Sequence, residues 1–311
     1  MNRFIEMLKE LFEDGEKKRL ENYDQSITNR KDIIRYENIK YGEDSIWNTL
    51  DVYRCQSLEG KVLPVLVNVH GGGWIYGDKK GYRYYCESLA DKGYVVVNIN
   101  YHLVDSAYFP KPMEDLNEAM NWIYENGQNY LMDIDHIFAL GDSAGAHILG
   151  AYACACSNEE YAKLFSFSFI KHPFEAMALN CGVYFVHFDE KKTDFVRMLA
   201  LNYLNLENIE KEKISSERLR EYNSKIDRFE FIKYINNNYP DTFVMSAQYD
   251  FVRMHSASLV SKLTQEGINM EYRMYGSKNH KLEHVFHTDL NLPEALLCNE
   301  DEIRFFKNHT L

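Results

Sequence analysis

The sequence contains 311 residues, of which 45% are hydrophobic and 26% charged, a composition typical of a globular protein large enough to enclose a substrate pocket. Its 35 basic and 47 acidic residues give a net charge of −12, which argues against nucleic-acid binding because such proteins need clustered lysine and arginine. An acidic surface favours neutral or cationic small ligands, so we expect a small-molecule substrate. No run approaches the roughly 18 apolar residues of a membrane span, so we expect no membrane-spanning segment.

The first 24 residues place charged side chains between apolar ones at helical spacing, so they predict a helix and not a secretory signal peptide. The six cysteines include no C-x-x-C pair, and Cys154 and Cys156 fall in the apolar run 151–156. Without a secretory signal, free thiols in a reducing cytoplasm are expected, and a disulfide or zinc framework is not. The sequence does not indicate an oligomeric state.

Short β-branched segments alternate with helical patterns along most of the chain. This alternation predicts an α/β fold with a mostly parallel sheet covered by helices on both faces. The predicted strands are 33–40, 50–55, 63–70, 94–101, 136–140, 177–186, 242–246 and 270–275, and the predicted helices are 82–92, 112–126, 144–156, 254–266 and 300–308.

The segment 188–238 interrupts this alternation with a polar stretch that is rich in Lys, Glu and Asn and helical in pattern. In an α/β enzyme such an insertion most often covers the active site. The alternative is a surface decoration without a role in the site.

The sequence Gly141-Asp142-Ser143-Ala144-Gly145 fits the pattern G-x-S-x-G, which by itself is common. Here an apolar strand enters the motif and an apolar helix leaves it, which is the strand–turn–helix context of an α/β-hydrolase nucleophile. In so tight a turn, Cβ atoms at 141 and 145 would collide with neighbouring elements, which explains both glycines. Ser143 is the predicted nucleophile.

A second glycine motif, His70-Gly71-Gly72-Gly73-Trp74, follows the predicted strand 63–70. Bare backbone N–H groups can approach the oxyanion that forms when a serine attacks a carbonyl. We predict Gly72, Gly73 and the N–H of Ala144 as donors, with Gly71 as the alternative. A phosphate loop is excluded because Asp78 occupies the place of its lysine.

The general base and its acidic partner are expected after late strands, in the order nucleophile, acid, base. His284 follows the predicted strand 270–275, with His287 as the alternative, and Asp250 follows the strand 242–246. Asp250 would fix the tautomer of the histidine and stabilise its protonated form.

Other polar residues near these motifs are expected to have structural roles. His70 lies within the glycine motif and would brace it by hydrogen bonding, Asp142 faces away from a triad, and Asp115 would pair within the protein. The cluster of histidines at 280–287 does not form the zinc motif H-E-x-x-H, and we predict neither a metal nor a cofactor.

Together these residues resemble the hormone-sensitive-lipase-like esterases of the α/β-hydrolase fold. The resemblance extends over roughly 35–308 and is carried by HGGGW at 70–74, Asn100-Tyr101, Phe109-Pro110, Asp115, GDSAG at 141–145, Asp250 and His284-Val285-Phe286. It implies a single domain, 1–311, that hydrolyses esters through an acyl-enzyme without a cofactor. It also implies a cap formed by the N-terminal helix, 1–24, and the insertion at about 188–238.

The sequence departs from this family at two places. Val285 occupies the position after the catalytic histidine where the family usually has glycine, and the stretch 246–249 is less rich in glycine and acidic residues than is usual. Either departure could reshape the side of the site that holds the leaving group.

The substrate is less determined than the chemistry. We expect small, short-acyl esters and expect Trp74, Tyr184 and Phe185 to line the pocket. The alternatives are an amidase or formamidase acting on a small aromatic amide, and a ligand-binding protein of this fold without catalytic activity.

Overall fold

The computed structural model describes residues 3–186, 195–206 and 216–309. Its centre is an eight-stranded sheet with the strand order β1-β2-β4-β3-β5-β6-β7-β8. The strand β1 pairs with β2, and β2 with β4, in antiparallel orientation, and all other neighbouring strands pair in parallel. The strands are β1 (Ile33–Lys40), β2 (Thr49–Cys55), β3 (Leu63–Val69), β4 (Val95–Ile99), β5 (Met132–Asp142), β6 (Ala176–Asn180), β7 (Asp241–Ala247) and β8 (Met270–Tyr275).

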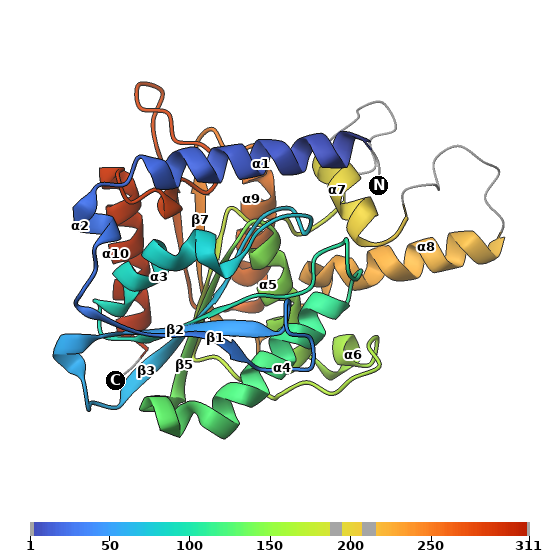
Figure 1. The fold of residues 1–311 in the computed structure, drawn as a ribbon. Helices are drawn as coiled ribbons and strands as arrows, with labels where there is room; N and C mark the ends of the chain where they lie inside the picture. Colours follow the sequence, from blue (N-terminus) through green and yellow to red (C-terminus); the bar gives the residue numbers. More distant parts are fainter. Residues whose placement is uncertain (1–2, 187–194, 207–215, 310–311) are drawn as a thin grey trace.

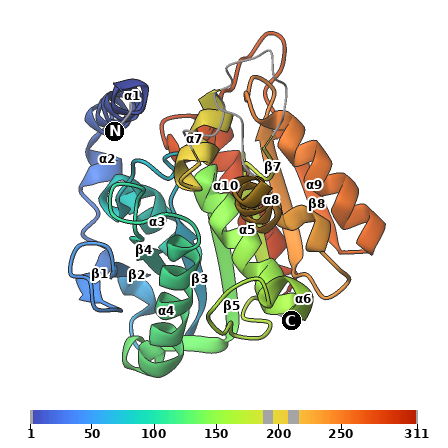
Figure 2. The same ribbon diagram turned by 90° about the vertical axis from the view of Figure 1, so that its right-hand side faces the viewer.

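Helices cover both faces of the sheet (Figures 1 and 2). Successive side chains of a strand point to opposite faces of the sheet, so apolar residues at every position require helices on both faces. In β3, Val65 and Val67 belong to one apolar core and Leu66 to the other. The first core includes α4 (Lys111–Asn126), α5 (Ala144–Ser157) and α9 (Arg253–Glu266), and the second includes α3 (Arg83–Ala90) and α10 (Pro293–Lys307). The remaining helices are α1 (Arg3–Glu21), α2 (Gln25–Thr28), α6 (Glu159–Ala162), α7 (Phe195–Tyr203) and α8 (Ser216–Phe229).

The predicted α/β architecture is confirmed, with differences at element ends. The strand β6 ends at Asn180 and not at 186, because Cys181 adopts a left-handed conformation with φ +48° and the chain leaves the sheet there. The last helix begins at Pro293 and not at 300, since proline is favoured in the first turn of a helix. All six cysteines are buried and unpaired.

The helix α1 runs across the end of the sheet at which the parallel strands finish, and α7 lies beside its N-terminal part (Figure 1). Polar contacts hold α1 in place. The Tyr23 hydroxyl, just beyond its end, donates to the Thr288 carbonyl (2.7 Å), and the Tyr76 hydroxyl donates to Glu16 (3.0 Å). Of the predicted insertion, residues 188–194 and 207–215 lie outside the described residues.

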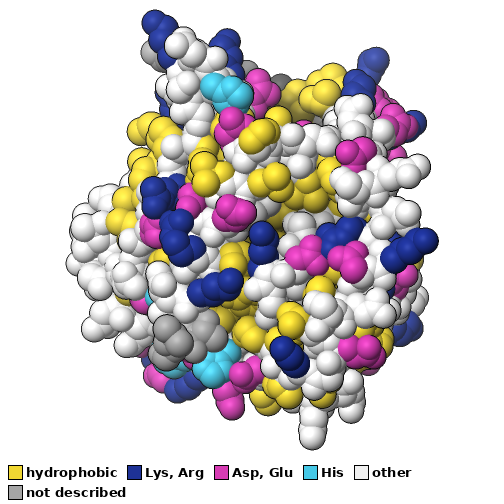
Figure 3. All heavy atoms as spheres, turned by 90° about the vertical axis from the view of Figure 1, so that its left-hand side faces the viewer, with side chains coloured by type: hydrophobic (Ala, Val, Ile, Leu, Met, Phe, Trp, Pro, Cys, Tyr) yellow, Lys and Arg dark blue, Asp and Glu magenta, His cyan; other side chains and the backbone are white. Residues whose placement is uncertain are grey.

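Surface charge is mixed on the face shown in Figure 3, where acidic and basic side chains alternate with apolar ones. Within the described ranges, no helix combines the length and the apolar character needed to cross a membrane.

Candidate active site

Ser143 lies in a sharp turn between β5 and α5, with a strained backbone (φ 51°, ψ −114°). A Cβ atom at Gly145 would lie 2.0 Å from the carbonyl oxygen of Val69, and one at Gly141 would lie 2.9 Å from the backbone of Gly145. Only glycine fits at these positions, as the motif predicts. The N–H of Ser143 donates to the Asn180 carbonyl at 2.8 Å, which anchors the turn to β6.

His284 joins the other two predicted catalytic residues. Its Nε2 lies 2.9 Å from the Ser143 Oγ, and its Nδ1 lies 2.8 Å from the Asp250 Oδ1. Asp250 is buried in the turn between β7 and α9, where its Oδ1 also accepts the N–H of Val252 (3.0 Å). Burial favours the neutral acid, but the hydrogen bond and the charge of His284 outweigh it, so the pKa of Asp250 is lowered.

The alternative base His287 lies elsewhere. It is fully buried, its ring packs edge-on against Tyr85 at 5.5 Å, and burial lowers its pKa to about 3. The third histidine of the cluster, His280, is exposed and lies 3.0 Å from Glu294. The three histidines therefore face different partners, and His284 is the one that reaches Ser143.

His70 and Asp142 support the loop around the site. The His70 Nδ1 lies 2.8 Å from the Gly71 carbonyl, its ring stacks on Tyr101, and burial lowers its pKa to about 4. Asp142 accepts a hydrogen bond from the Tyr82 hydroxyl (2.9 Å), and burial raises its pKa to about 6. Neither residue is hydrogen-bonded to Ser143, as the base would be, or to His284, as the acid would be.

Asp115 is fully buried and pairs within the protein. It accepts hydrogen bonds from the backbone N–H and the Nδ1 of His102, each at 2.8 Å, and from Asn48 at 3.0 Å. These contacts hold the chain after β4 against α4, so Asp115 is a structural partner of the loop and not part of the triad.

Three backbone N–H groups are available beside Ser143. The N–H of Gly71 is occupied, because it donates to the Tyr82 hydroxyl at 3.0 Å. In the described part of the chain, the N–H groups of Gly72, Gly73 and Ala144 have no acceptor, and all three residues line the same pocket as Ser143. Gly72 has φ +118°, and a Cβ there would lie 2.0 Å from the Tyr76 carbonyl, so the loop requires glycine.

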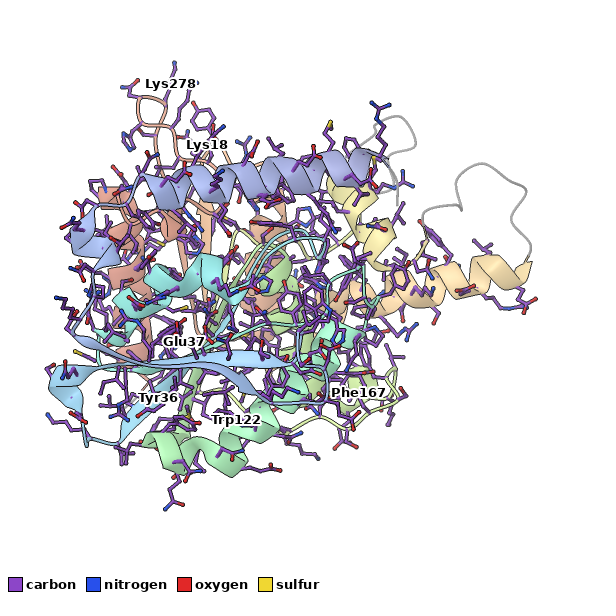
Figure 4. The ribbon with its side chains drawn as sticks, viewed as in Figure 1. Lys18, Tyr36, Glu37, Trp122, Phe167 and Lys278 are labelled. Carbon is purple, nitrogen blue, oxygen red and sulfur yellow. The ribbon has the colours of Figure 1, made fainter. Side chains whose placement is uncertain are left out.

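The pocket that contains Ser143 has a volume of about 1000 Å³ and mostly apolar walls. Phe12 of α1 and Leu199 of α7 form one wall, both directly beside Gly73. In the view of Figure 4, the loop after β8, marked by Lys278, extends beyond the level of α1, and residues of both segments, such as Leu282 and Glu16, line the pocket. Polar residues that line the pocket besides Ser143 and His284 include Glu16, Arg19, Tyr82, Thr288 and Asp289.

The predicted pocket aromatics need a correction. Trp74 lines the pocket, with its ring stacked on Tyr203 (4.8 Å), but Tyr184 and Phe185 do not. Tyr184 is fully buried against Phe231, and Phe185 stacks on His255 at 3.9 Å. The chain leaves the sheet at Asn180, and of the residues that follow it is Val183 that lines the pocket.

The departure at Val285 has a structural consequence. Val285 has φ 52° and ψ 30°, the left-handed region that β-branched residues rarely adopt. Glycine, which the resemblance leads us to expect at this position, would enter this region without strain. Here the loop that carries His284 holds a valine in a conformation that costs about 1–3 kcal/mol.

A buried carboxyl lies behind the nucleophile turn. Glu302 of α10 is fully buried and accepts a hydrogen bond from the Asn180 side chain (2.5 Å), while the Asn180 carbonyl holds the Ser143 N–H. Burial raises the pKa of Glu302 to about 8. The folded protein therefore keeps a proton at Glu302 that the unfolded chain has released.

This proton predicts how stability depends on pH. The folded-state pKa lies above the unfolded value, so the carboxyl lowers the free energy of unfolding progressively from about pH 4.5 to 8. The measurement is urea unfolding of wild type and Glu302→Gln. Across this pH window, we expect the free energy of unfolding of the variant to rise relative to that of wild type by on the order of a few kcal/mol. The control is Glu300→Gln on the exposed side of the same helix. If the difference in free energy of unfolding between wild type and Glu302→Gln is the same at pH 5 as at pH 8, the prediction is contradicted.

Residues 50–263, more than half of the chain, match the family model described as BD-FAE. The chain belongs to the BD-FAE family. The resemblance to α/β-hydrolase esterases that the motifs indicate is thereby confirmed.

Relatives of this BD-FAE family member are named esterases. Esterase LipQ of Mycobacterium tuberculosis (strain ATCC 25618 / H37Rv) is 34% identical over 132 residues, which cover 42% of this chain and 31% of LipQ. The probable carboxylic ester hydrolase LipM of the same organism is 27% identical over 223 residues, covering 71% and 49%. The match thus spans about a third of LipQ and half of LipM.

Solved structures show the same fold over nearly the whole chain. Esterase B from Lactobacillus rhamnosis superposes with a TM-score of 0.84 at 22% identity, covering 99% of this chain and 94% of that one. An esterase from Pyrobaculum calidifontis superposes with a TM-score of 0.70 at 19% identity, covering 98% and 92%. At these identities the superpositions establish the α/β-hydrolase fold.

Proposed function

We propose that this protein is a serine carboxylic ester hydrolase in which Ser143, His284 and Asp250 form the catalytic triad. The observation that carries the proposal is the continuous chain of hydrogen-bond contacts from Ser143 Oγ through His284 to Asp250, at 2.9 and 2.8 Å. The relatives that are named esterase and probable carboxylic ester hydrolase support the same reaction class.

In the proposed mechanism, His284 takes the proton of Ser143 as the hydroxyl attacks the ester carbonyl. The N–H groups of Gly72, Gly73 and Ala144 stabilise the oxyanion. His284 then protonates the leaving alcohol, which leaves an acyl group on Ser143, and activates the water that hydrolyses it. Asp250 orients the imidazole and stabilises its protonated form.

We further propose that the chain is a single catalytic domain in which α1 and the insertion form the cap. The support comes from the pocket, in which Phe12 of α1 and Leu199 of α7 adjoin the oxyanion loop at Gly73. The apolar walls and the volume of about 1000 Å³ leave room beyond an acetyl group. We therefore expect butyrate and octanoate esters to be substrates in addition to acetate.

The test is hydrolysis of p-nitrophenyl acetate, butyrate, octanoate and palmitate by the wild type and by Ser143→Ala. We expect turnover of acetate through octanoate, loss of it in the variant, and weak turnover of palmitate. A folded wild type that hydrolyses none of these esters would contradict the proposal. Aryl amides and stoichiometric labelling by an organophosphate would then distinguish an amidase from a ligand-binding protein, which should not react.

A further inference from the structure

The helix α1 contributes two kinds of side chain to the pocket. Phe4, Leu8 and Phe12 line the pocket from the first part of the helix, and Glu16 and Arg19 line it from the last part. These residues follow one another at spacings of three or four, so they lie on one face of the helix. The face of α1 that lines the pocket therefore changes from apolar to charged along the helix.

The charged part of this face is attached to the loop that carries the base. A guanidinium nitrogen of Arg19 donates to the Thr288 hydroxyl, and that hydroxyl donates to the Val285 carbonyl at 3.0 Å. The guanidinium also lies 6.0 Å from the centre of the Tyr82 ring. In the proposed mechanism His284 protonates the leaving alcohol, so residues beside its loop border the alcohol part of the substrate.

The apolar part of the same face borders the opposite part of the pocket. Phe12 lies beside Gly73 together with Leu199 of α7, and Phe195 and Val196 of α7 also line the pocket. This part offers apolar side chains only, which suits the alkyl chain of an acyl group. A single helix thus faces the acyl chain with apolar residues and the alcohol with charged ones.

The side chains of Glu16 and Arg19 can form more hydrogen bonds than those that hold α1 in place. A guanidinium has five N–H groups, and among the described residues only the Thr288 hydroxyl and the Gly81 carbonyl (3.1 Å) accept from Arg19. The Glu16 Oε1 accepts from the Tyr76 hydroxyl at 3.0 Å. No described residue donates to the Oε2, which lies 3.9 Å from a guanidinium nitrogen. Spare donors and a spare acceptor therefore lie next to each other in the pocket lining.

The charges in the lining disfavour a charged alcohol. Arg19 and Glu16 carry opposite charges 3.9 Å apart, so they cancel locally. Lys281 is basic, and the other acidic residues in the lining are Asp142, Glu283 and Asp289. An anionic alcohol finds no excess of positive charge here, and a cationic alcohol would meet the guanidinium.

We propose that Glu16 and Arg19 form an alcohol subsite that selects esters of neutral, hydroxylated alcohols. A hydroxyl near the ester oxygen accepts from the guanidinium and donates to the Glu16 carboxyl. This inference rests on the proposed hydrolysis of esters at Ser143. Glycerol and sugars both supply such hydroxyls, and the chemistry that they share is what the subsite recognises.

The subsite rejects an alkyl alcohol for a physical reason. An alkyl chain removes water from the carboxyl and the guanidinium without replacing the hydrogen bonds that the water made. Sites built to bind a hydroxyl therefore discriminate strongly against an analogue that lacks it. We expect kcat/KM for glycerol monobutyrate to exceed that for propyl butyrate at least roughly tenfold.

The experiment compares these two esters, which have the same acyl group and the same three-carbon alcohol and differ only in two hydroxyls. A butyrate monoester of methyl glucoside presents the same chemistry on a ring, and the faster of the two hydroxylated esters identifies the source. Butyrylcholine supplies a cationic alcohol. We measure kcat/KM for each ester by titration of the released butyric acid.

Two variants test the residues, and a third is the matched control. In Glu16→Gln the amide oxygen can still accept from Tyr76, while an NH2 group replaces the free oxygen. Arg19→Met keeps an unbranched side chain and removes every donor. Tyr23→Phe removes another attachment of the same end of α1, the 2.7 Å hydrogen bond to the Thr288 carbonyl, and Tyr23 does not line the pocket.

We expect Glu16→Gln and Arg19→Met each to lower the ratio of kcat/KM for glycerol monobutyrate to that for propyl butyrate roughly tenfold. Tyr23→Phe should leave the ratio unchanged. A wild-type ratio near one, a ratio unchanged in Glu16→Gln, an equal fall in Tyr23→Phe, or a preference for butyrylcholine would each overturn the proposal.

Failure of the proposed function can be distinguished from failure of the subsite. If the wild type hydrolyses p-nitrophenyl butyrate but does not distinguish the two esters, only the subsite is wrong. If it hydrolyses no ester, the proposed function fails, and calorimetry then compares binding of glycerol monobutyrate to the wild type and to Glu16→Gln. Weaker binding by the variant supports the subsite, and equal binding overturns it.

Discussion

Ser143→Ala is expected to lower kcat/KM for p-nitrophenyl butyrate by roughly four to six orders of magnitude, and adding His284→Ala should lower it little further. The two residues act as a unit, because the histidine has no proton to accept once the hydroxyl is absent. Activity that remains would come from the three free N–H groups and from binding in the pocket.

The measurement is steady-state hydrolysis by both single variants and the double variant, with thermal unfolding to show that each is folded. Ser258→Ala on the exposed side of α9 and His136→Ala in the first half of β5 are matched controls that should retain full activity. Losses that multiply in the double variant would show that Ser143 and His284 act independently, which contradicts a triad.

The second large effect is expected from Gly145→Ala, which should destabilise the fold by more than ~3 kcal/mol and abolish activity. The added Cβ would lie 2.0 Å from the Val69 carbonyl oxygen and 2.5 Å from that of His70. Both contacts are with backbone, so neither can be relieved by rotating a side chain. Relief requires moving α5 away from β3, which separates Ser143 from the oxyanion loop.

Gly15→Ala is the matched control for this substitution. Gly15 lies within α1, and a Cβ there meets nothing within 4 Å. Alanine should therefore stabilise the protein by about 0.5–1 kcal/mol through its helix propensity. The two variants are compared by urea unfolding. Near-wild-type stability of Gly145→Ala would show that the contact of α5 with β3 is looser than the structure describes.

The nucleophile turn and the oxyanion loop could be predicted because their chemistry is local. Gly141 is required by a clash with the backbone of Gly145 within one turn, and Gly72 by a clash with a residue four positions later. The strands and helices were likewise predictable, since alternation and helical spacing are properties of neighbouring residues. The order of Ser143, Asp250 and His284 added the third constraint, because parallel strands end at one edge of the sheet.

The partners of these residues depend on long-range packing. His284 and His287 lie three residues apart on one loop, and only the turn after β8 decides that the first meets Ser143 while the second is buried against Tyr85.

The sequence by itself determined the sheet, the nucleophile turn and the class of reaction, because these follow from periodicity and from steric limits on a few adjacent residues. The tertiary structure decided the walls of the pocket. Phe12 and Leu199 meet at Gly73 from helices at distant places in the chain, whereas Tyr184 and Phe185 pack against Phe231 and His255. Where a side chain points after a strand ends depends on the path of the backbone and on what packs against it, and neither is encoded in the spacing of nearby residues.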